Sequence, residues 1–210
     1  MKQLSLGRNR LLTRIWLALF GTFLVAIGIR LIVLGNMGAD ALSTLILGLM
    51  NHAPWQFGTF SLLINILILI VTFFKNREMI GIASLINSFG IGLFLNGFDF
   101  LGILQKLPHN YHLLGVILGT SLFAFGTALY LLTMSGSGAY DCLMVQLKNQ
   151  FKLSIRAARI LLDGTFMLIG FLLGGTVGLG TVIVLVLLGV LIDWFMVHLP
   201  KFFPKFFAFN

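Results

Sequence analysis

The sequence is poor in cysteine and in charged residues. Its single cysteine, Cys142, excludes a disulfide within the chain and any metal site built from several cysteines. Only 10% of the 210 residues are charged, whereas 59% are hydrophobic, and the mean hydropathy is +1.04. Soluble domains of this size do not have such a composition. The shortage of charge therefore excludes soluble protein classes and indicates a membrane protein.

Groups that could support catalysis are also scarce. The four histidines, His52, His109, His112 and His198, all lie in loops or at the ends of apolar segments, and their spacing does not gather three metal ligands. The sequence suggests no Ser/His/Asp set, and Cys142 has no obvious base beside it. We therefore expect a protein that is not an enzyme and that has no cofactor or metal ion.

Basic residues outnumber acidic ones by 14 to 6, which gives a formal net charge of +8. A basic chain can bind nucleic acid, but here the bases lie in short connections between apolar runs. Such a distribution is the usual orientation signal of the inner membrane leaflet. The expected partner is therefore the lipid bilayer, and no nucleic acid is expected.

Six apolar runs are long enough to cross a bilayer, whose apolar core needs about 20 helical residues. The first follows the basic segment Met1–Arg14 and extends to Leu34. A signal peptide has a shorter apolar core followed by a small-residue cleavage site. No such site follows this run, so we expect a retained span. The other five expected spans are roughly 57–74, 79–97, 112–134, 157–174 and 179–198.

Two further apolar segments, Ala39–Asn51 and Ala139–Lys152, are too short to cross. Each reaches only about 20 Å as a helix. Both place apolar residues at helical spacing, so they are expected to be interfacial or re-entrant helices.

The positions of the basic residues favour six crossings with both termini inside. The outer side then has only Lys106, and Arg30 lies near the outer end of the first span. Letting the short segments cross as well gives eleven bases against two, which is barely worse, so segment length decides. The inner side receives the other twelve bases: Lys2, Arg8, Arg10, Arg14, Lys75, Arg77, Lys148, Lys152, Arg156, Arg159, Lys201 and Lys205.

The two halves of this single membrane domain resemble one another, about 15–100 and about 112–198. Gly38-Ala39-Asp40-Ala41-Leu42 matches Ala139-Tyr140-Asp141-Cys142-Leu143, and Asn65 matches Asp163. Each half contains three spans and one short helix. An odd number of spans per half inverts the second half, as in many secondary transporters. The alternative is a duplication that serves packing alone.

Several of these motifs carry a resemblance to a known family. They are Asp141-Cys142-Leu143-Met144, Arg159 followed by Asp163, the run Leu172 to Thr181 (LLGGTVGLGT), and the segment Gly35–Leu42. With them the chain resembles the YczE/YyaS/YitT family of bacterial integral membrane proteins, and most of all its YczE-type members. The resemblance implies a multi-pass protein of the bacterial cytoplasmic membrane and implies no substrate.

Six polar residues are candidates for a substrate or ion site. Asp40 and Asp141 each precede a short helix, where a carboxylate can cap the helix or contact a cation or substrate. Arg159 and Asp163 lie four positions apart, on one helical face of an apolar span. They form either a structural ion pair or a gate or proton-coupling group. Asn65 could be the neutral counterpart of Asp163.

The sixth candidate, Asn87, lies in the third span and can bridge helices or line a cavity. Arg30 is expected to reach the headgroups or to pair with Asp40.

Two functions fit these features. The first is a small transporter or channel for a small solute or ion, which could form a homodimer. The second is a membrane partner protein that docks or stabilises another protein without transport.

Overall fold

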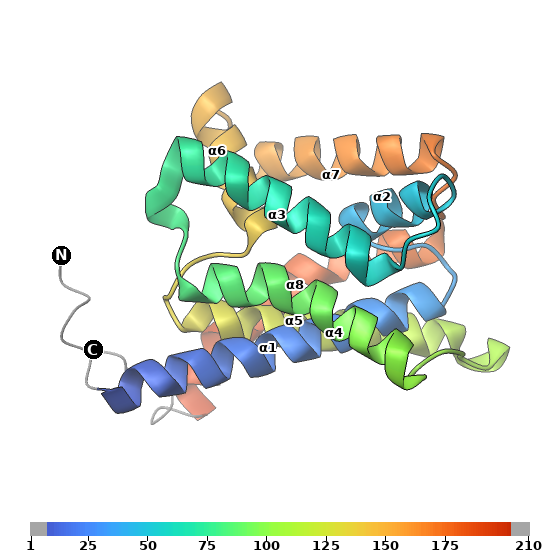
Figure 1. The fold of residues 1–210 in the computed structure, drawn as a ribbon, viewed down its shortest axis with the longest axis horizontal. Helices are drawn as coiled ribbons and strands as arrows, with labels where there is room; N and C mark the ends of the chain where they lie inside the picture. Colours follow the sequence, from blue (N-terminus) through green and yellow to red (C-terminus); the bar gives the residue numbers. More distant parts are fainter. Residues whose placement is uncertain (1–7, 203–210) are drawn as a thin grey trace.

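The computed structural model describes residues 8–202, and all regular elements in this range are helical (Figure 1). This confirms the predicted all-α class. The expected inner bases Lys2 and Lys205 lie outside the described residues. Two 3₁₀ turns, Arg77–Met79 and His109–Tyr111, accompany eight α-helices: α1 (Arg8–Leu34), α2 (Ala41–Met50), α3 (Phe57–Asn76), α4 (Ile82–Leu101), α5 (His112–Leu132), α6 (Ala139–Phe151), α7 (Ile155–Leu172) and α8 (Leu179–Phe202).

Five helices of the described chain are long and apolar enough to cross a membrane, namely α1, α3, α4, α5 and α8. The segment expected to be the fifth of six spans, 157–174, forms α7, which has 18 residues. This helix carries three charged residues, Arg156, Arg159 and Asp163, so its composition is too polar for it to be counted among the helices that could cross a membrane. The two short segments form the short helices α2 and α6, as predicted.

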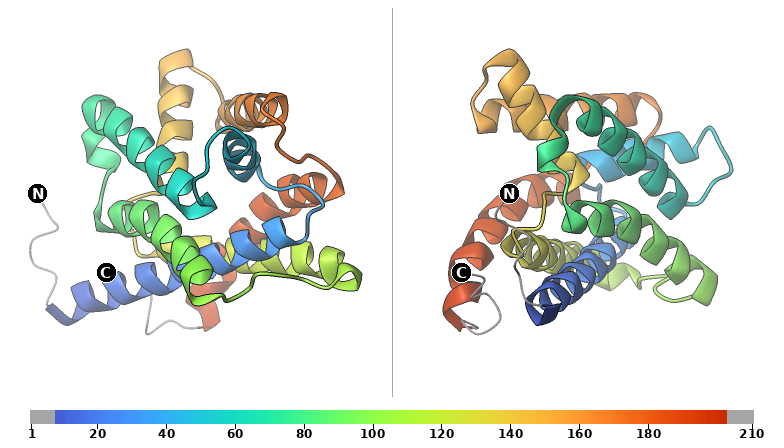
Figure 2. Two further views of the ribbon diagram at one scale, coloured as in Figure 1. Left: turned by 45° about the vertical axis from the view of Figure 1, so that its right-hand side comes forward. Right: turned by 60° about the vertical axis from the view of Figure 1, so that its left-hand side comes forward.

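The helices form two layers (Figures 1 and 2). In one layer α4 packs against α1, α1 against α5, and α5 against α8. In the other layer α2, α3, α6 and α7 form a closed ring, in which each helix contacts two others. Contacts between α3 and α4 join the layers. The largest hydrophobic cluster lies where α1, α2, α3 and α4 meet, and it includes Val25, Ile46, Phe60 and Leu95.

Glycines bring α1 and α5 into close antiparallel contact. A Cβ atom built on Gly21 would lie 2.6 Å from the carbonyl oxygen of Gly126. A Cβ atom built on Gly28 would lie 2.6 Å from the carbonyl oxygen of Gly119. Real Cβ atoms do not approach backbone oxygens this closely, so both crossing points require residues without a side chain.

The chain leaves α1 and α5 through similar turns. Asn36 after α1 has φ 48°, and Met134 after α5 has φ 50°. Two residues later, Gly38 and Gly136 also have positive φ, at 95° and 118°. These values belong to the left-handed region, which favours glycine.

Each of these turns docks on the first residues of a helix from the other half. The Gly180 N–H donates to the Met37 carbonyl oxygen over 2.7 Å, at the start of α8. At the start of α4, the Ala83 N–H donates to the Ser135 carbonyl oxygen over 3.0 Å. Both bonds satisfy N–H groups that have no partner within their own helix.

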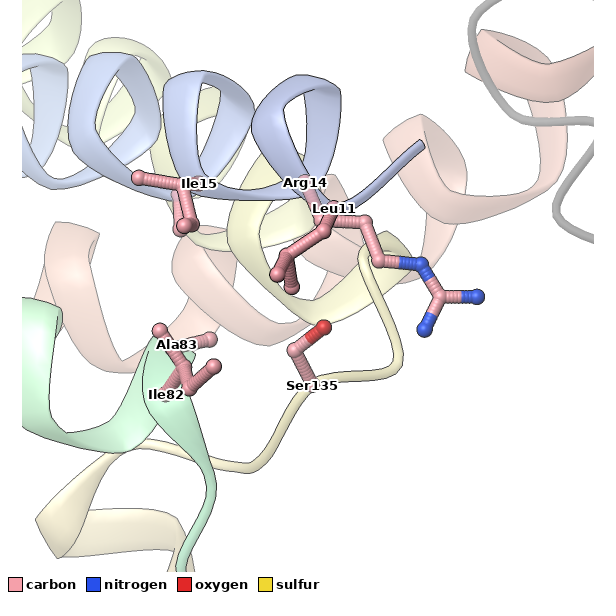
Figure 3. A pocket seen from close by; sticks show the side chains of 7 residues that line it. Leu11, Arg14, Ile15, Ile82, Ala83 and Ser135 are labelled. Carbon is pink, nitrogen blue, oxygen red and sulfur yellow. The ribbon is translucent and has the colours of Figure 1, made fainter. Parts of the chain in front are cut away.

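Figure 3 shows the second docking point from nearby. Leu11 and Ile15 of α1 face Ile82 and Ala83 of α4, with Ser135 beside them. The space between these side chains is too small for a water molecule. We therefore interpret this place as a packing seam.

The glycine crossing gives a stability prediction. Gly28→Ala should lower the melting temperature of the purified protein in detergent, because the new methyl group overlaps the backbone of α5. Such overpacking costs about 1–3 kcal/mol. Gly189→Ala is the matched control, because nothing lies within 4 Å of a Cβ atom there. Equal melting temperatures for both variants would contradict the close crossing.

Candidate functional site

Asp40 caps helix α2, which is the first of the two roles considered for it. It has extended backbone angles, and its Oδ2 accepts a hydrogen bond from the Ser43 N–H over 3.2 Å. This is the usual N-cap bond, and it also places a negative charge at the positive end of the helix dipole. The other carboxylate oxygen, Oδ1, is buried and has no hydrogen-bond partner. One of the two carboxylate oxygens is therefore buried without a hydrogen bond.

Asp141 is not the N-cap of helix α6, so the first of the two roles considered for it, that of N-cap, is wrong. The N-cap of α6 is Gly138, and Asp141 is the third residue of the helix. Its Oδ2 accepts a hydrogen bond from the Tyr130 hydroxyl of α5 over 2.8 Å. The carboxylate therefore joins α6 to α5.

The side chain of Asn87 in α4 lies close to the hydrogen bond between Tyr130 and Asp141. A Cβ atom built on Gly138 would lie 2.8 Å from the Tyr130 hydroxyl, 3.1 Å from Asn87 Oδ1 and 3.3 Å from Asp141 Oδ2. Three oxygen atoms from three helices thus surround one glycine. Asn87 is only 5% exposed, and its Nδ2 is buried without a hydrogen-bond partner.

Arg159 and Asp163 form the predicted ion pair within α7. Arg159 Nε lies 3.2 Å from Asp163 Oδ2, and the two side chains are 34% and 16% exposed. The Tyr140 hydroxyl of α6 donates a hydrogen bond to Asp163 Oδ1. The Arg159 guanidinium carbon also lies 5.7 Å from the centre of the Tyr140 ring, within range of a cation–π contact. Asp163 therefore has a partner on each oxygen.

These groups form one electrostatic unit, which we call the polar core: Asp40, Asn87, Tyr130, Tyr140, Asp141, Arg159 and Asp163. Burial raises the pKa of the Asp40 carboxyl, and the nearby charge of Asp163 raises it further, against the hydrogen bonds from Ser43. Burial also raises the pKa of the Asp141 carboxyl, against the Tyr130 hydrogen bond and the charge of Arg159. Both acids lie outside the five long apolar spans.

The predictions for Asn65 and Arg30 have different outcomes from those for the polar core. Asn65 is buried, but its Nδ2 donates to the Ser61 carbonyl oxygen of its own helix over 2.8 Å. That it is the neutral counterpart of Asp163 stays a prediction. Arg30 does not pair with Asp40: its Nη2 lies 2.6 Å from Asp99 Oδ1, and its Nε donates to the Leu104 carbonyl oxygen.

A pocket of about 390 Å³ lies near this second ion pair. Arg30 and Asp99 line it together with Trp55, Phe57 and other residues of α1–α3. None of the six candidate residues lines this pocket. In the described part of the chain, no three His, Cys, Asp or Glu residues are grouped so that they could hold a metal ion.

Sequence reasoning missed the tyrosines of the polar core. The chain has only three tyrosines, and two of them bind the partly buried carboxylates of Asp141 and Asp163. A buried tyrosine hydroxyl generally needs a hydrogen-bond partner. The rarity of tyrosine in so apolar a sequence was therefore a usable signal for Tyr130 and Tyr140.

The contacts of Asp163 give a second prediction. Asp163→Ala should lower the melting temperature more than Asp163→Asn, because alanine leaves Arg159 and Tyr140 without an acceptor. The double variant Arg159→Ala with Asp163→Ala should recover part of the loss, since it leaves no unpaired guanidinium. Losses in the double variant that equal the sum of the single losses would show that the pair is not coupled.

Residues 12–197 match the model of a protein family described as a family of unknown function, DUF6198. An uncharacterized protein of Haemophilus influenzae is 35% identical over 184 residues, which cover 85% of this chain and 81% of that protein. Two relatives from Bacillus subtilis are each 26% identical. The uncharacterized protein YyaS matches over 87% of this chain and 92% of its own length, and the uncharacterized membrane protein YczE over 82% and 80%.

No solved structure matches the chain. The match to the family model covers most of the sequence, and the relatives agree with the long apolar helices and with the resemblance inferred above. The chain belongs to the DUF6198 family and is a multi-pass membrane protein of the YczE/YyaS type.

Proposed function

We propose that the protein is a transporter or channel of the bacterial cytoplasmic membrane, which moves a small solute or ion through the polar core. We propose no catalytic activity. The observation that carries this proposal is a cluster of three partly buried acids, a buried amide and a partly buried arginine inside a chain that is otherwise apolar. Ionisable groups within a membrane protein are costly and mark solute and ion pathways.

Both halves of the chain contribute to the polar core. Asp40 and Asn87 come from the first half, whereas Asp141, Arg159 and Asp163 come from the second. A site between two halves is the arrangement expected for inverted-repeat transporters.

Backbone geometry supports the repeat. The positive φ angles occur at Asn36 and Met134, and again at Gly38 and Gly136, in each case 98 positions apart. The turns that contain these residues each dock on a helix start in the other half.

The helix contacts support the inversion. The repeat spacing relates Gly21 to Gly119 and Gly28 to Gly126, while the observed contacts join Gly21 to Gly126 and Gly28 to Gly119. A two-fold axis exchanges these two contacts. It also exchanges the α1–α4 contact with the α5–α8 contact, and the α2–α7 contact with the α3–α6 contact.

We further propose that α7 is the sixth span, and that α2 and α6 are re-entrant. Six crossings agree with the start of α1 and the end of α8, which lie toward the same side in Figure 1. Most of α2 is buried, and it packs against α3 and α7. That burial favours insertion into the bundle over an interfacial position.

The second candidate, a partner protein that does not transport, has one observation in its favour. Asp40 Oδ1 and Asn87 Nδ2 have almost no accessible surface, so solvent does not reach these atoms of the polar core. A closed core fits either a structural element or one state of a transporter that opens.

An accessibility experiment separates the two functions without knowledge of the substrate. In a Cys142→Ala background, Asn87→Cys should react with a small charged thiol reagent from both sides of the membrane, because a transporter exposes its site to each side in turn. Labelling would be measured in whole cells and in inside-out vesicles.

Leu95→Cys is the matched control, two turns further along α4 and only 1% exposed within an apolar cluster. It should remain unlabelled. If Asn87→Cys is as unreactive as this control from both sides, transport is wrong and the partner role is favoured.

Topology gives another prediction. Lys75 Nζ donates to Gln150 Oε1 over 3.0 Å, so the ends of α3 and α6 lie together, and both segments carry bases. Lys75→Cys should therefore be labelled only from the cytoplasmic side, and Lys106→Cys only from the outside. Labelling of Lys75→Cys from outside would rule out the proposed orientation.

A further inference from the structure

The charges of the polar core do not balance. It contains three carboxyl groups, Asp40, Asp141 and Asp163, but only one cation, the Arg159 guanidinium. Arg159 is paired directly with Asp163, which also receives the Tyr140 hydroxyl. If Asp40 and Asp141 were ionised as well, three negative charges would share one positive charge in the interior, which is costly.

The hydrogen bonds show which carboxylate oxygens have few donors around them. Asp40 Oδ2 accepts from the Ser43 N–H and the Ser43 side chain also favours the ionised carboxyl, whereas the buried Oδ1 has no hydrogen-bond partner. Around Gly138, the oxygens of Asn87 and Asp141 face the same small space, where Tyr130 donates one hydroxyl and Gly138 one backbone N–H to Asp141. The buried Asn87 side chain is an observation independent of the acids, because its carbonyl oxygen points into this space while its amide nitrogen has no partner.

The missing charge is better supplied by protons than by a metal ion. The acids of the described residues do not form a group of three that could hold one metal. Each acid instead meets a hydroxyl, an amide or a backbone N–H, which are partners suited to a neutral carboxylic acid as well as to a carboxylate.

We propose that the polar core binds two exchangeable protons, one on the carboxyl of Asp40 and one on the carboxyl of Asp141. With both protons bound, the core is neutral: Arg159 balances Asp163, and the other two acids carry no charge. This inference deepens the proposed function, because it makes the proton the ion that the transporter takes up and releases.

The groups that face these two acids, and the burial of the acids, each favour or oppose the release of their protons. Asp40 lies near Asp163 and Tyr140, and Asp141 lies near Tyr130, Cys142 and Arg159. Arg159 is the only cation among them and favours the ionised form of Asp141. Burial of both carboxyls has the opposite and larger effect.

The sign of the pH dependence follows. Burial raises the pKa of both carboxyls in the folded state, so the folded protein holds protons that the unfolded chain releases. This contribution to stability is present at low pH and is lost as the pH rises from the unfolded value, about 3.9, through the folded pKa. The melting temperature of the wild type should therefore fall as the pH is raised.

The test compares melting curves of the full-length protein in detergent from pH 5 to pH 9. The double variant Asp40→Asn with Asp141→Asn resembles the doubly protonated core, so it should fold and should lose at least half of the wild-type pH dependence. Asp193→Asn is the matched control: this acid is exposed on α8, and its removal should leave the dependence unchanged. A double variant with the full wild-type dependence would overturn the proposal.

A second measurement needs no variant. A hydrophobic carbodiimide adds to protonated carboxyl groups in apolar surroundings, and mass spectrometry locates the modified peptides. We expect modification at Asp40 and Asp141 that declines at least tenfold between pH 6 and pH 9. Absence of modification at both acids throughout this range would also overturn the proposal.

The outcomes separate this inference from the proposed function. If Asn87→Cys is labelled from both sides but the pH effects are absent, the protein opens as a transporter and does not bind these protons. If the pH effects are present but Asn87→Cys stays unlabelled, the protons belong to a core that does not open.

Discussion

The contact between α1 and α5 is the constraint on which the rest of the molecule depends. Two pairs of glycines let the backbones touch, and each crossing point leaves no room for a methyl group. Helices in a bilayer gain little from hydrophobic association, since lipid is as apolar as leucine, so close packing of small residues has to hold them together. Because α1 and α5 each lead into a short helix, their separation also sets the distance between the two turns that precede these short helices.

Those turns position the polar core. After α1 the chain reverses through Asn36 and Gly38 and places Asp40 at the first turn of α2. After α5 it reverses through Met134 and Gly136 and places Gly138 in the corresponding capping position of α6. The acid of the second half therefore lies inside the first turn of its helix, where it accepts from the Tyr130 hydroxyl and from the backbone of the N-cap residue Gly138.

The sequence specified the local features well. Segment lengths predicted which helices are long and which are short, and the spacing of Arg159 and Asp163 predicted their ion pair. Both features are properties of a single continuous segment of the chain. A helix brings residues four positions apart together whatever surrounds it.

Contacts between distant segments were not predictable in the same way. The partner of Arg30 is Asp99 in another helix, and the hydroxyls that bind the acids come from Tyr130 and Tyr140. The number of bases and acids indicated that buried charges need partners, but not which ones. Asp141 was misplaced because the alignment of the two acids ignored the capping register, in which Asp40 corresponds to Gly138.

This difference between the halves gives the polar core its asymmetry. A side chain at Gly138 would crowd the oxygens of Tyr130, Asn87 and Asp141, so the glycine keeps open the space in which they meet. In the first half the equivalent position is occupied by Asp40, whose side chain bonds its own helix and leaves one oxygen without a partner. On the proposed repeat, a single ancestral turn has thus become two unlike acid sites. The ionised form of Asp40 is stabilised by hydrogen bonds from Ser43, and that of Asp141 by the Tyr130 hydroxyl, the charge of Arg159 and the Gly138 N–H. Because these surroundings differ, we expect the two acids to release their protons at different pH.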